Sequence, residues 1–382
     1  MDLAFVNRMA GIARGGGEIW DLKMAEGLEE RGADITFYVG KPLRSELPEP
    51  IDEFETVEIP TPHLRDHAYA APPGVGGMLA HIDTKIFCQR VVKELQKRNH
   101  ELVQICSRPH FAQYVDQIDA PVSIVMHGEP YSLWYDVVKP WGSTYELLEA
   151  FDQVITVGGT REVIEKRVSC SVATVNPGVD TDIFTPRDGE DTNNKGVLFV
   201  GRFVPAKNLE LLVEAFSRIY DNHPRVKLVL VGDGPEGDII RREVKRQGIA
   251  NQVSFAGYIP NNELPEVYRR ATVVTLSSKS ESYGMTLLEA MSCGVPVIAP
   301  DIGVIPEIVD DKKNGLVYPE GSVEELVNAL DTILSDDKVQ RTYAKAARKK
   351  AVDSFGWDKK QEKINYLYNK ITNKIIKNNP EK

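Results

Sequence analysis

Short apolar runs alternate with helical patterns along this chain, and the alternation stops once and then starts again. In the first half, apolar runs of strand length occur at residues 3–6, 34–39, 102–106, 122–126 and 153–157. Between the first two of them, segment 18–31 has apolar residues at the spacing of a helix. A rhythm of strand and helix predicts a parallel sheet that is covered by helices on both faces.

A polar, turn-rich stretch at residues 181–195 interrupts this rhythm. Beyond it, strand-like runs at 197–200, 226–231, 253–256, 273–276 and 295–299 alternate with helical patterns at 209–220, 237–247, 263–270 and 285–291. We therefore predict two Rossmann-like, doubly wound α/β domains that face each other across a cleft, with ligands at the carboxyl ends of the strands. The predicted ranges are 1–180 for the N-terminal domain, 181–195 for the linker and 196–356 for the C-terminal domain.

Charge, cysteine spacing and hydropathy exclude several classes of function. The net charge is −10 and no segment is a dense basic block, which argues against nucleic acid as a partner. The four cysteines are scattered without a CxxC pair, so we expect buried free thiols and no zinc or disulfide framework. No apolar run has the length of a membrane span, and the N-terminus lacks the pattern of a signal peptide. We expect a cytoplasmic protein, with peripheral contact at the inner face of the membrane left open.

Two segments after predicted strands suggest a site for a diphosphate. Gly201 and Arg202 directly follow a strand, and Lys207 precedes a helix, so two cations flank a strand-to-helix junction. The alternative is a solvated loop with incidental cations. The turn at Gly232 also follows a strand, and we expect this glycine near a ligand, with a purely structural turn as the competing interpretation.

The most informative segment runs from Glu281 to Glu289, with seven residues between the two glutamates. Glu281 is predicted in a loop and Glu289 about one turn into a helix. The free backbone amides at the helix start suit phosphate oxygens; they belong to Ser282, Tyr283, Gly284, Met285 and Thr286. Glu289 can accept hydrogen bonds from two ribose hydroxyls, and its apolar neighbours predict partial burial rather than an ordinary surface carboxylate.

In the first half, the glycines at 15–17 open a helix and can present amides to an anion. His127 lies at the carboxyl end of a predicted strand, where it can bind a sugar hydroxyl, although a lone histidine is more often structural. The sequence has no GxSxG elbow for a hydrolase, and no HExxH motif or Cys/His cluster for a metal.

Taken together, these motifs resemble the retaining GT-B glycosyltransferases of family four, the glycosyl transferases group 1. The resemblance covers nearly the whole chain, through segments 14–40, 175–180, 201–207, 257–260, 281–289, 293–299, 306–309 and 314–317. One departure is Asn176-Pro177-Gly178, where many members have Pro-Asn-Gly.

The resemblance implies a role for each matching residue. Arg202 and Lys207 would neutralise the leaving diphosphate, Glu289 would bind ribose, and Glu281 would contact the transferred sugar. In the N-terminal domain, Gly16 and Gly17 would let the glycine loop approach the phosphate, and His127 would contact the donor sugar. Main-chain contacts at Tyr258 and Ile259 would bracket the base. The family needs no cofactor and no metal, and its last helix, here 357–377, would complete the N-terminal domain.

The resemblance predicts transfer of a hexosyl unit (mannose, glucose or N-acetylglucosamine type) from a UDP- or GDP-sugar to a hydroxyl of a sugar, lipid-linked sugar or small-molecule acceptor. A nucleotide-sugar epimerase of the same fold and a non-catalytic nucleotide-sugar-binding protein are the alternatives. Region 60–78 is rich in Pro and Gly and contains His63 and His67. We expect this region to be a loop that shapes the acceptor side or makes a membrane contact.

Overall fold

The computed structural model describes residues 1–10, 16–43, 51–62, 75–127, 144–187 and 196–378. The chain folds as two compact units, and each is described by itself. The N-terminal unit consists of Met1–Asn176 together with Asp358–Lys382, and the C-terminal unit is Pro177–Trp357.

The N-terminal unit is built on a sheet with the strand order β3-β2-β1-β4-β5-β6-β7. All of these neighbours pair in parallel. The strands are β1 (Asp2–Val6), β2 (Asp34–Pro42), β3 (Glu55–Thr61), β4 (Leu102–Cys106), β5 (Val122–Met126), β6 (Gln153–Thr156) and β7 (Ser171–Thr174). The helices are α1 (Gly16–Glu29), α3 (Val75–Leu95), α5 (Thr144–Leu148) and α6 (Arg161–Glu165), with the short 3-10 segments η1 (Pro109–Gln117) and η2 (Gly158–Thr160).

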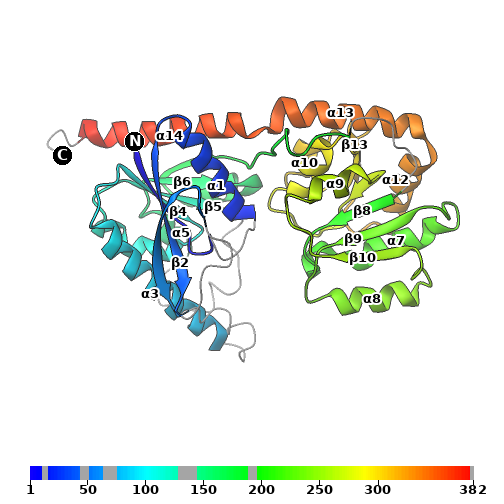
Figure 1. The fold of residues 1–382 in the computed structure, drawn as a ribbon, viewed down its shortest axis with the longest axis horizontal. Coiled ribbons are helices and arrows are strands. Elements are labelled where there is room, and N and C mark those ends of the chain that lie inside the picture. The colour runs from blue at the N-terminus through cyan, green and yellow to red at the C-terminus, as the bar shows by residue number, and fades with distance from the viewer. Residues whose placement is uncertain (11–15, 44–50, 63–74, 128–143, 188–195, 379–382) are drawn as a thin grey trace. The chain divides into compact units, whose positions relative to one another are not determined.

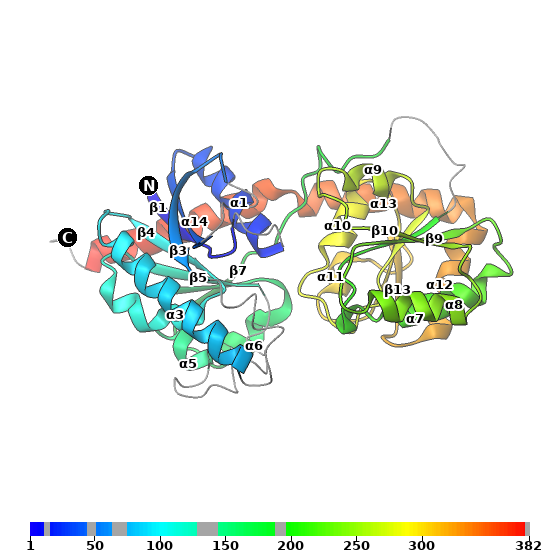
Figure 2. The ribbon, with the colours of Figure 1, turned by 60° about the horizontal axis from the view of Figure 1, so that its bottom comes forward.

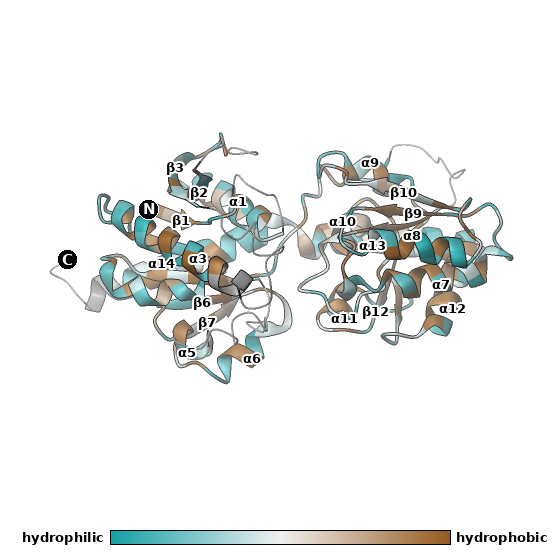
Figure 3. Ribbon diagram, turned by 90° about the horizontal axis from the view of Figure 1, so that it is seen from below, coloured by the Kyte–Doolittle hydropathy of each residue, from teal (hydrophilic) through white to brown (hydrophobic). Residues whose placement is uncertain are grey.

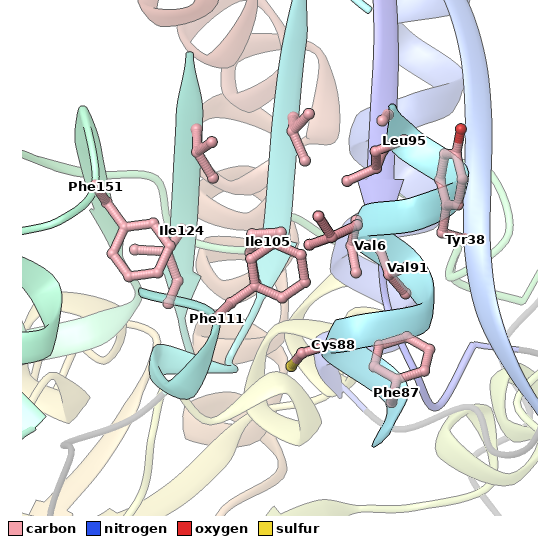
Figure 4. Close-up of a cluster of buried hydrophobic side chains, with 14 of the residues drawn as sticks. Val6, Tyr38, Phe87, Cys88, Val91, Leu95, Ile105, Phe111, Ile124 and Phe151 are labelled. Atoms are coloured by element: carbon pink, nitrogen blue, oxygen red, sulfur yellow. The ribbon is translucent and has the colours of Figure 1, made fainter. Parts of the chain in front are cut away.

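Helix α3 covers one face of this sheet and α14 (Trp357–Asn378) covers the other (Figure 1). Figure 4 shows Phe87, Cys88 and Val91 of α3 packed toward Val6 and Ile105 of the strands, all of them buried. These contacts remove large apolar side chains from water, which is the main driving force for docking α3.

Helix α14 follows the C-terminal unit in sequence but completes the N-terminal one. The Tyr368 hydroxyl donates a 2.6 Å hydrogen bond to Gln104 Oε1 on β4, and both side chains are buried. Gln361 Nε2 donates to the Lys23 carbonyl of α1 at 2.7 Å. A Cβ on Gly27 would lie 2.0 Å from the Gln361 side chain, so α1 needs glycine there for α14 to approach.

The C-terminal unit repeats this design with the strand order β10-β9-β8-β11-β12-β13, again with parallel neighbours throughout. The strands are β8 (Gly196–Val200), β9 (Lys227–Val231), β10 (Val253–Gly257), β11 (Val273–Thr275), β12 (Val297–Pro300) and β13 (Gly315–Tyr318). They are mainly apolar along their length (Figure 3). Near-continuous apolar strands are typical of parallel sheets with both faces covered.

Two groups of helices lie on opposite sides of this sheet (Figure 2). Helix α7 (Leu209–Tyr220) contacts α8 (Gly237–Arg246) and α12 (Val323–Ser335), whereas α10 (Met285–Ser292) contacts α9 (Leu264–Arg269) and α13 (Asp337–Phe355). The remaining elements are η3 (Pro205–Lys207) and α11 (Ile305–Ile308).

The segments that enter and leave the C-terminal unit lie side by side. Val179 N donates to the Phe355 carbonyl at 2.8 Å, and Val179 forms a parallel bridge with Gly356. A Cβ on Gly178 would lie 2.9 Å from the Trp357 backbone, so this close approach requires glycine. Residues 177–180, which the sequence assigned to the first domain, therefore pack within the second unit.

The predicted fold class of two Rossmann-like α/β domains is confirmed, because both sheets have the doubly wound order that reverses between the first and fourth strands of each unit. The expectation that region 60–78 is a loop was wrong at both ends of the region. Region 60–78 is not loop throughout, since Pro60 belongs to β3 and residues 75–78 to α3. His63 and His67 lie outside the described residues. No helix within the described ranges is long and apolar enough to cross a membrane.

The Tyr368–Gln104 contact yields a stability prediction. Tyr368→Phe should destabilise the protein by about 1–2 kcal/mol, because Gln104 Oε1 loses its donor in a buried site. We expect the thermal midpoint to fall by about 2–8 °C. Tyr366→Phe on the same helix is the matched control, since Tyr366 is exposed, and it should leave the midpoint unchanged. Equal effects of the two substitutions would contradict a buried role for the Tyr368 hydroxyl.

Candidate functional site

The loops that follow β8 and β11 meet at the carboxyl edge of the C-terminal sheet, where the strand order reverses. Lys279 N donates to the Ala206 carbonyl at 2.8 Å, and Ser277 Oγ donates to the Lys207 carbonyl at 2.8 Å. These bonds join two loops that lie far apart in the sequence. They fix the backbone of the segment that holds the predicted cations.

Lys207 and Glu281 form an ion pair across these loops. Lys207 Nζ lies 2.6 Å from Glu281 Oε1, and Ser278 Oγ donates to the same oxygen at 2.6 Å. The Glu281 side chain is 8% exposed and that of Lys207 is 22% exposed. A pair this shielded is screened little by salt. The carboxylate therefore positions the ammonium group at the mouth of the sheet.

Gly232 is explained by the approach of two backbones. Its φ is +122°, and a Cβ there would lie 1.9 Å from the Gly201 carbonyl oxygen. Gly232 N also donates to the Gly257 carbonyl at 2.7 Å. The close approach to Gly201 thus explains why residue 232 is a glycine. This agrees with the competing interpretation, in which the turn is purely structural. Arg202, next to Gly201, is exposed to solvent.

Helix α10 starts beside this ion pair. Gly284 precedes it with φ +85°, in the left-handed region that favours glycine, and Leu287 N donates back to the Gly284 carbonyl at 2.9 Å. Thr286 Oγ1 donates to the Val200 carbonyl at 3.2 Å, which ties the helix start to the end of β8. Of the other predicted residues, Ser282 is exposed, Tyr283 is buried and Met285 is partly buried. The first-turn amides of α10 thus lie at the same sheet edge as Lys207.

Glu289, in the second turn of α10, is buried, as its apolar neighbours predicted. The Tyr268 hydroxyl on α9 donates to Glu289 Oε2 at 2.6 Å. Burial raises the pKa of Glu289 to about 7, and the hydrogen bond from Tyr268 partly offsets this rise. Among the described residues no other group binds this carboxylate, so Oε1 has capacity for a ligand hydroxyl. Burying a carboxyl group costs free energy unless it is hydrogen-bonded, so additional donors from a ligand would stabilise Glu289.

Tyr258 and Ile259 follow β10 at the same edge of the sheet. Tyr258 is 73% exposed, an unusual position for a large aromatic side chain, and Ile259 is half-buried. The structure therefore brings the predicted residues of the C-terminal unit to one sheet edge.

In the N-terminal unit the structure brings together Gly17 and His127. A Cβ on Gly17 would lie 3.0 Å from His127 Cδ2, so the glycine leaves room for the imidazole. The His127 ring meets Trp20 edge-on at 5.5 Å between centroids. Burial lowers the pKa of His127 to about 4, so the ring is neutral near pH 7. Gly16 is exposed at the start of α1, and the loop residues Arg14, Gly15, Gly128 and Glu129 lie outside the described residues.

Sequence reasoning missed two residues beside His127. Asp21 on α1 and Cys106 at the end of β4 lie with His127 in one cluster, whose potential ligand atoms are within 4.8 Å of one another. Burial raises the pKa of Asp21 to about 7 and that of Cys106 well above its usual value. The three residues are distant in sequence and match no spacing motif. The register of β4 and β5 could have indicated their proximity. Cys106 pairs with Val125, and His127 is two residues beyond Val125, so both side chains belong to the same face of the sheet.

Residues 180–350 match the family model described as glycosyl transferases group 1. D-inositol 3-phosphate glycosyltransferase of Kribbella flavida is 34% identical over 204 residues, which are 49% of this chain and 48% of that protein. The chain thus spans about half the length of the curated relatives it matches first. Spore coat protein SA of Bacillus subtilis is 26% identical over 76% of this chain and 84% of its own length.

Among solved structures, sucrose-phosphate synthase from Thermosynechococcus elongatus aligns with a TM-score of 0.79 at 23% identity, over 97% of this chain and 98% of that chain. HepE of Anabaena, solved in complex with UDP and glucose, aligns with a TM-score of 0.76 at 18% identity, over 97% and 100% of the two chains. At these identities the likeness shows the fold, which is the GT-B architecture of two Rossmann-like domains.

The raised pKa of Glu289 yields a pH prediction for the ligand-free protein. The folded protein keeps the Glu289 proton up to about pH 7, whereas the unfolded chain releases it near the ordinary value of 4.5. Stability therefore falls as pH rises from 4.5 to 7. Glu289→Gln removes this cost, so we expect the variant to gain roughly 2 kcal/mol over wild type between pH 5 and pH 8.

Urea unfolding of both proteins at the two pH values measures this gain. Glu307→Gln, at an exposed position in the same unit, is the control and should show no such change. A constant difference between Glu289→Gln and wild type at both pH values would show that Glu289 ionises normally.

Proposed function

We propose that the chain is a retaining glycosyltransferase of the glycosyl transferases group 1 family, whose model matches residues 180–350. It moves a hexosyl unit from a UDP- or GDP-sugar to a hydroxyl of a sugar, lipid-linked sugar or small-molecule acceptor. The observation that carries this proposal is the sheet edge of the C-terminal unit. There the ammonium of Lys207 lies on the loop after β8, and the neighbouring helix α10 contributes its first-turn amides and the buried carboxyl of Glu289.

Lys207 and Arg202 hold the diphosphate of the donor in this proposal. The ammonium of Lys207 has three donors, so it can keep its bond to Glu281 and also bind a phosphate oxygen. Arg202 is exposed on the adjacent loop, where its planar fork suits a second phosphate. The first-turn amides of α10 add donors for the same anion. These groups stabilise negative charge as the sugar leaves, which is why the proposal needs neither a metal at the diphosphate nor a cofactor.

Glu289 is the ribose anchor. Its Oε1 has two lone pairs and can accept hydrogen bonds from two neighbouring ribose hydroxyls, while Oε2 keeps the bond from Tyr268. Two hydroxyls at this carboxyl would offset part of its desolvation, so binding should favour the ionised form. Tyr258 and Ile259 supply the surface next to the base. That HepE was solved with UDP and glucose supports a uridine donor as one of the two choices.

The reaction proposed is a substitution on one face of the sugar. The bond from the anomeric carbon to the diphosphate oxygen breaks and the bond to the acceptor oxygen forms on the same face. The acceptor proton passes to a diphosphate oxygen. Glu281 is already bound to Lys207 and Ser278, so its role is to position the cation and contact the sugar rather than to attack carbon. We place the acceptor on the N-terminal unit. In this proposal, that unit also contributes Gly16 and Gly17, which let their loop approach the phosphate, and His127, which contacts the donor sugar.

Lys207→Ala tests the diphosphate role. We expect turnover to fall about 100- to 1000-fold, the range seen when a donor that stabilises developing charge is removed. The variant also leaves the Glu281 carboxylate without its cation, so its thermal midpoint should be measured alongside. Lys279→Ala is the matched control, because Lys279 is exposed on the neighbouring loop and joins it through its backbone. Wild-type turnover in a folded Lys207→Ala protein would remove this role.

Measurements of nucleotide binding test two parts of the proposal: the role of Glu289 at the ribose, and the choice between a UDP- and a GDP-sugar as donor. A thermal-shift screen of UDP- and GDP-sugars should identify one base that stabilises the wild-type protein. Glu289→Ala should weaken that nucleotide about 10- to 100-fold, because its hydroxyls lose a charged acceptor. Isothermal titration measures the change. The proposal fails if no nucleotide sugar binds the wild-type chain, or if Glu289→Ala binds as tightly.

A further inference from the structure

The segment that enters the C-terminal unit packs against the residue that holds the ribose anchor. The Phe184 side chain is 4% exposed, and its ring centroid lies 6.0 Å from that of Tyr268, with 60° between the ring planes. Tyr268 is fully buried, and its hydroxyl donates to Glu289 Oε2 at 2.6 Å. One aromatic contact therefore connects this segment to the hydrogen bond that Glu289 receives.

Side chains of three helices fix the backbone around Phe184. Ser292 Oγ on α10 donates to the Phe184 carbonyl at 2.6 Å. Arg348 Nη1 on α13 donates to the same carbonyl at 3.0 Å and to the Ser292 carbonyl at 2.8 Å. Arg269 Nε on α9 donates to the Thr185 carbonyl at 2.7 Å. Hydrogen bonds from charged donors are stronger than those between neutral groups, so these contacts determine where the Phe184 ring begins.

The packing continues two residues beyond Phe184. Gly294, in the turn after α10, has φ +70°, and a Cβ there would lie 3.1 Å from Pro186 Cγ. Residues 184–186 thus follow α9 and α10, the helices that contain Tyr268 and Glu289. A segment held in this way is part of the packed unit and can determine the position of the side chains that it touches.

The ring of Phe184 is more than the backbone contacts require. Ser292 and the two arginines already hold the segment through main-chain carbonyls, which any residue at 184 would supply. An aromatic pair, in contrast, has a preferred geometry. Because the Tyr268 hydroxyl lies at the far end of a rigid ring, packing against that ring determines where the hydroxyl lies. The Thr286 hydroxyl of α10 lies within hydrogen-bonding reach of the same phenol oxygen.

We propose that Phe184 is a positioning residue of the donor site. Its ring holds Tyr268 so that the phenol donates to Glu289 Oε2, and this leaves Oε1 for the ribose hydroxyls. This role rests on the proposed function, in which Glu289 binds the ribose. It extends the donor site to a residue that acts through Tyr268 rather than on the nucleotide.

The role has an electrostatic consequence. Burial raises the pKa of Glu289 to about 7, and the bond from Tyr268 partly offsets this rise. A displaced phenol raises the pKa further, so less of the ionised form is present at pH 7 to bind hydroxyls. The Cys293 thiol lies near both groups but is neutral near pH 7, because burial raises its pKa to about 12. Arg269 and Arg348 lie beside this thiol, and their charge does not change with pH.

A double-mutant cycle on the full chain tests the role, with UDP and GDP titrated separately by calorimetry. Phe184→Leu keeps an apolar side chain but loses the ring. We expect it to weaken the nucleotide that the wild type binds by about 3- to 10-fold at pH 7. Tyr268→Phe should weaken it by a similar factor. Adding Phe184→Leu to Tyr268→Phe should cause no further loss, because the hydroxyl through which Phe184 acts is already absent.

Phe216→Leu is the matched control, since Phe216 is buried on α7 in the same unit. It should lower the thermal midpoint without changing nucleotide affinity. Wild-type affinity in folded Phe184→Leu would overturn the proposal. A loss that adds to that of Tyr268→Phe would also overturn it, because Phe184 would then act independently of the hydroxyl.

A second measurement needs no nucleotide. Carbon-13 NMR of labelled glutamate follows the titration of Glu289 in the ligand-free protein, and Glu289→Gln assigns its resonance. We expect the midpoint to rise in Phe184→Leu and to stay at the wild-type value in Phe216→Leu. An unchanged midpoint in both variants contradicts the positioning role. If Phe184→Leu does not fold, Phe184→Met replaces it, because the flexible side chain of methionine fills irregular gaps.

The two measurements separate this role from the proposed function. If the wild-type chain binds neither UDP nor GDP, the proposed function fails, and the titration of Glu289 still tests the contact between Phe184 and Tyr268. If the wild type binds a nucleotide and Phe184→Leu changes neither affinity nor midpoint, the proposed function stands and only the role of Phe184 fails.

Discussion

In both sheets, every strand pair that the structure describes is parallel, and a parallel connection has to return through a crossover before the next strand can begin. Every loop that follows a strand therefore emerges at the same edge. Where the strand order reverses, between β1 and β4 and between β8 and β11, neighbouring loops lead to helices on opposite faces and leave room between them. Lys207 and Glu281 occupy one such place, and Cys106 lies at the other.

The two glutamates of the C-terminal unit are close in sequence but differ in what holds them. Glu281 has an ammonium and a hydroxyl on one oxygen. Within the part of the chain that the structure describes, Glu289 accepts a hydrogen bond only from the Tyr268 hydroxyl, and burial raises its pKa to about 7. A carboxylate with a resident cation keeps its geometry with or without a ligand. A carboxyl with unused hydrogen-bonding capacity is more stable when a ligand supplies donors, and this difference separates a positioning group from a binding group.

Much of this arrangement was predictable because it depends on local patterns. The apolar runs and helical spacings located β1, β8, α7 and α10. The apolar neighbours of Glu289 predicted its burial. In the Pro/Gly-rich region 60–78, the end of β3 and the start of α3 were not predicted, because Pro and Gly weaken the local sequence signals of strand and helix.

Pairings between distant segments could not be predicted in this way. Tyr268 reaches Glu289 from another helix, and Lys207 reaches Glu281 from another loop, so both contacts depend on how elements pack. Gly232 was expected near a ligand, but its conformation is explained by the carbonyl of Gly201, which only the fold places there. Asp21, Cys106 and His127 converge through sheet register rather than through any motif.

The position of α14 has a consequence for the order in which the chain can fold during its synthesis. The N-terminal unit is discontinuous, because the complete C-terminal unit is inserted between Asn176 and Asp358. When synthesis has reached Asn176, Gln104 has no Tyr368 to bind and the face of α1 around Gly27 has no Gln361 to cover it. The C-terminal unit is continuous in sequence, so it can fold as soon as all of its residues have left the ribosome. Of these two units, the one whose synthesis begins earlier is therefore completed later, and one face of its sheet stays uncovered until α14 has been made.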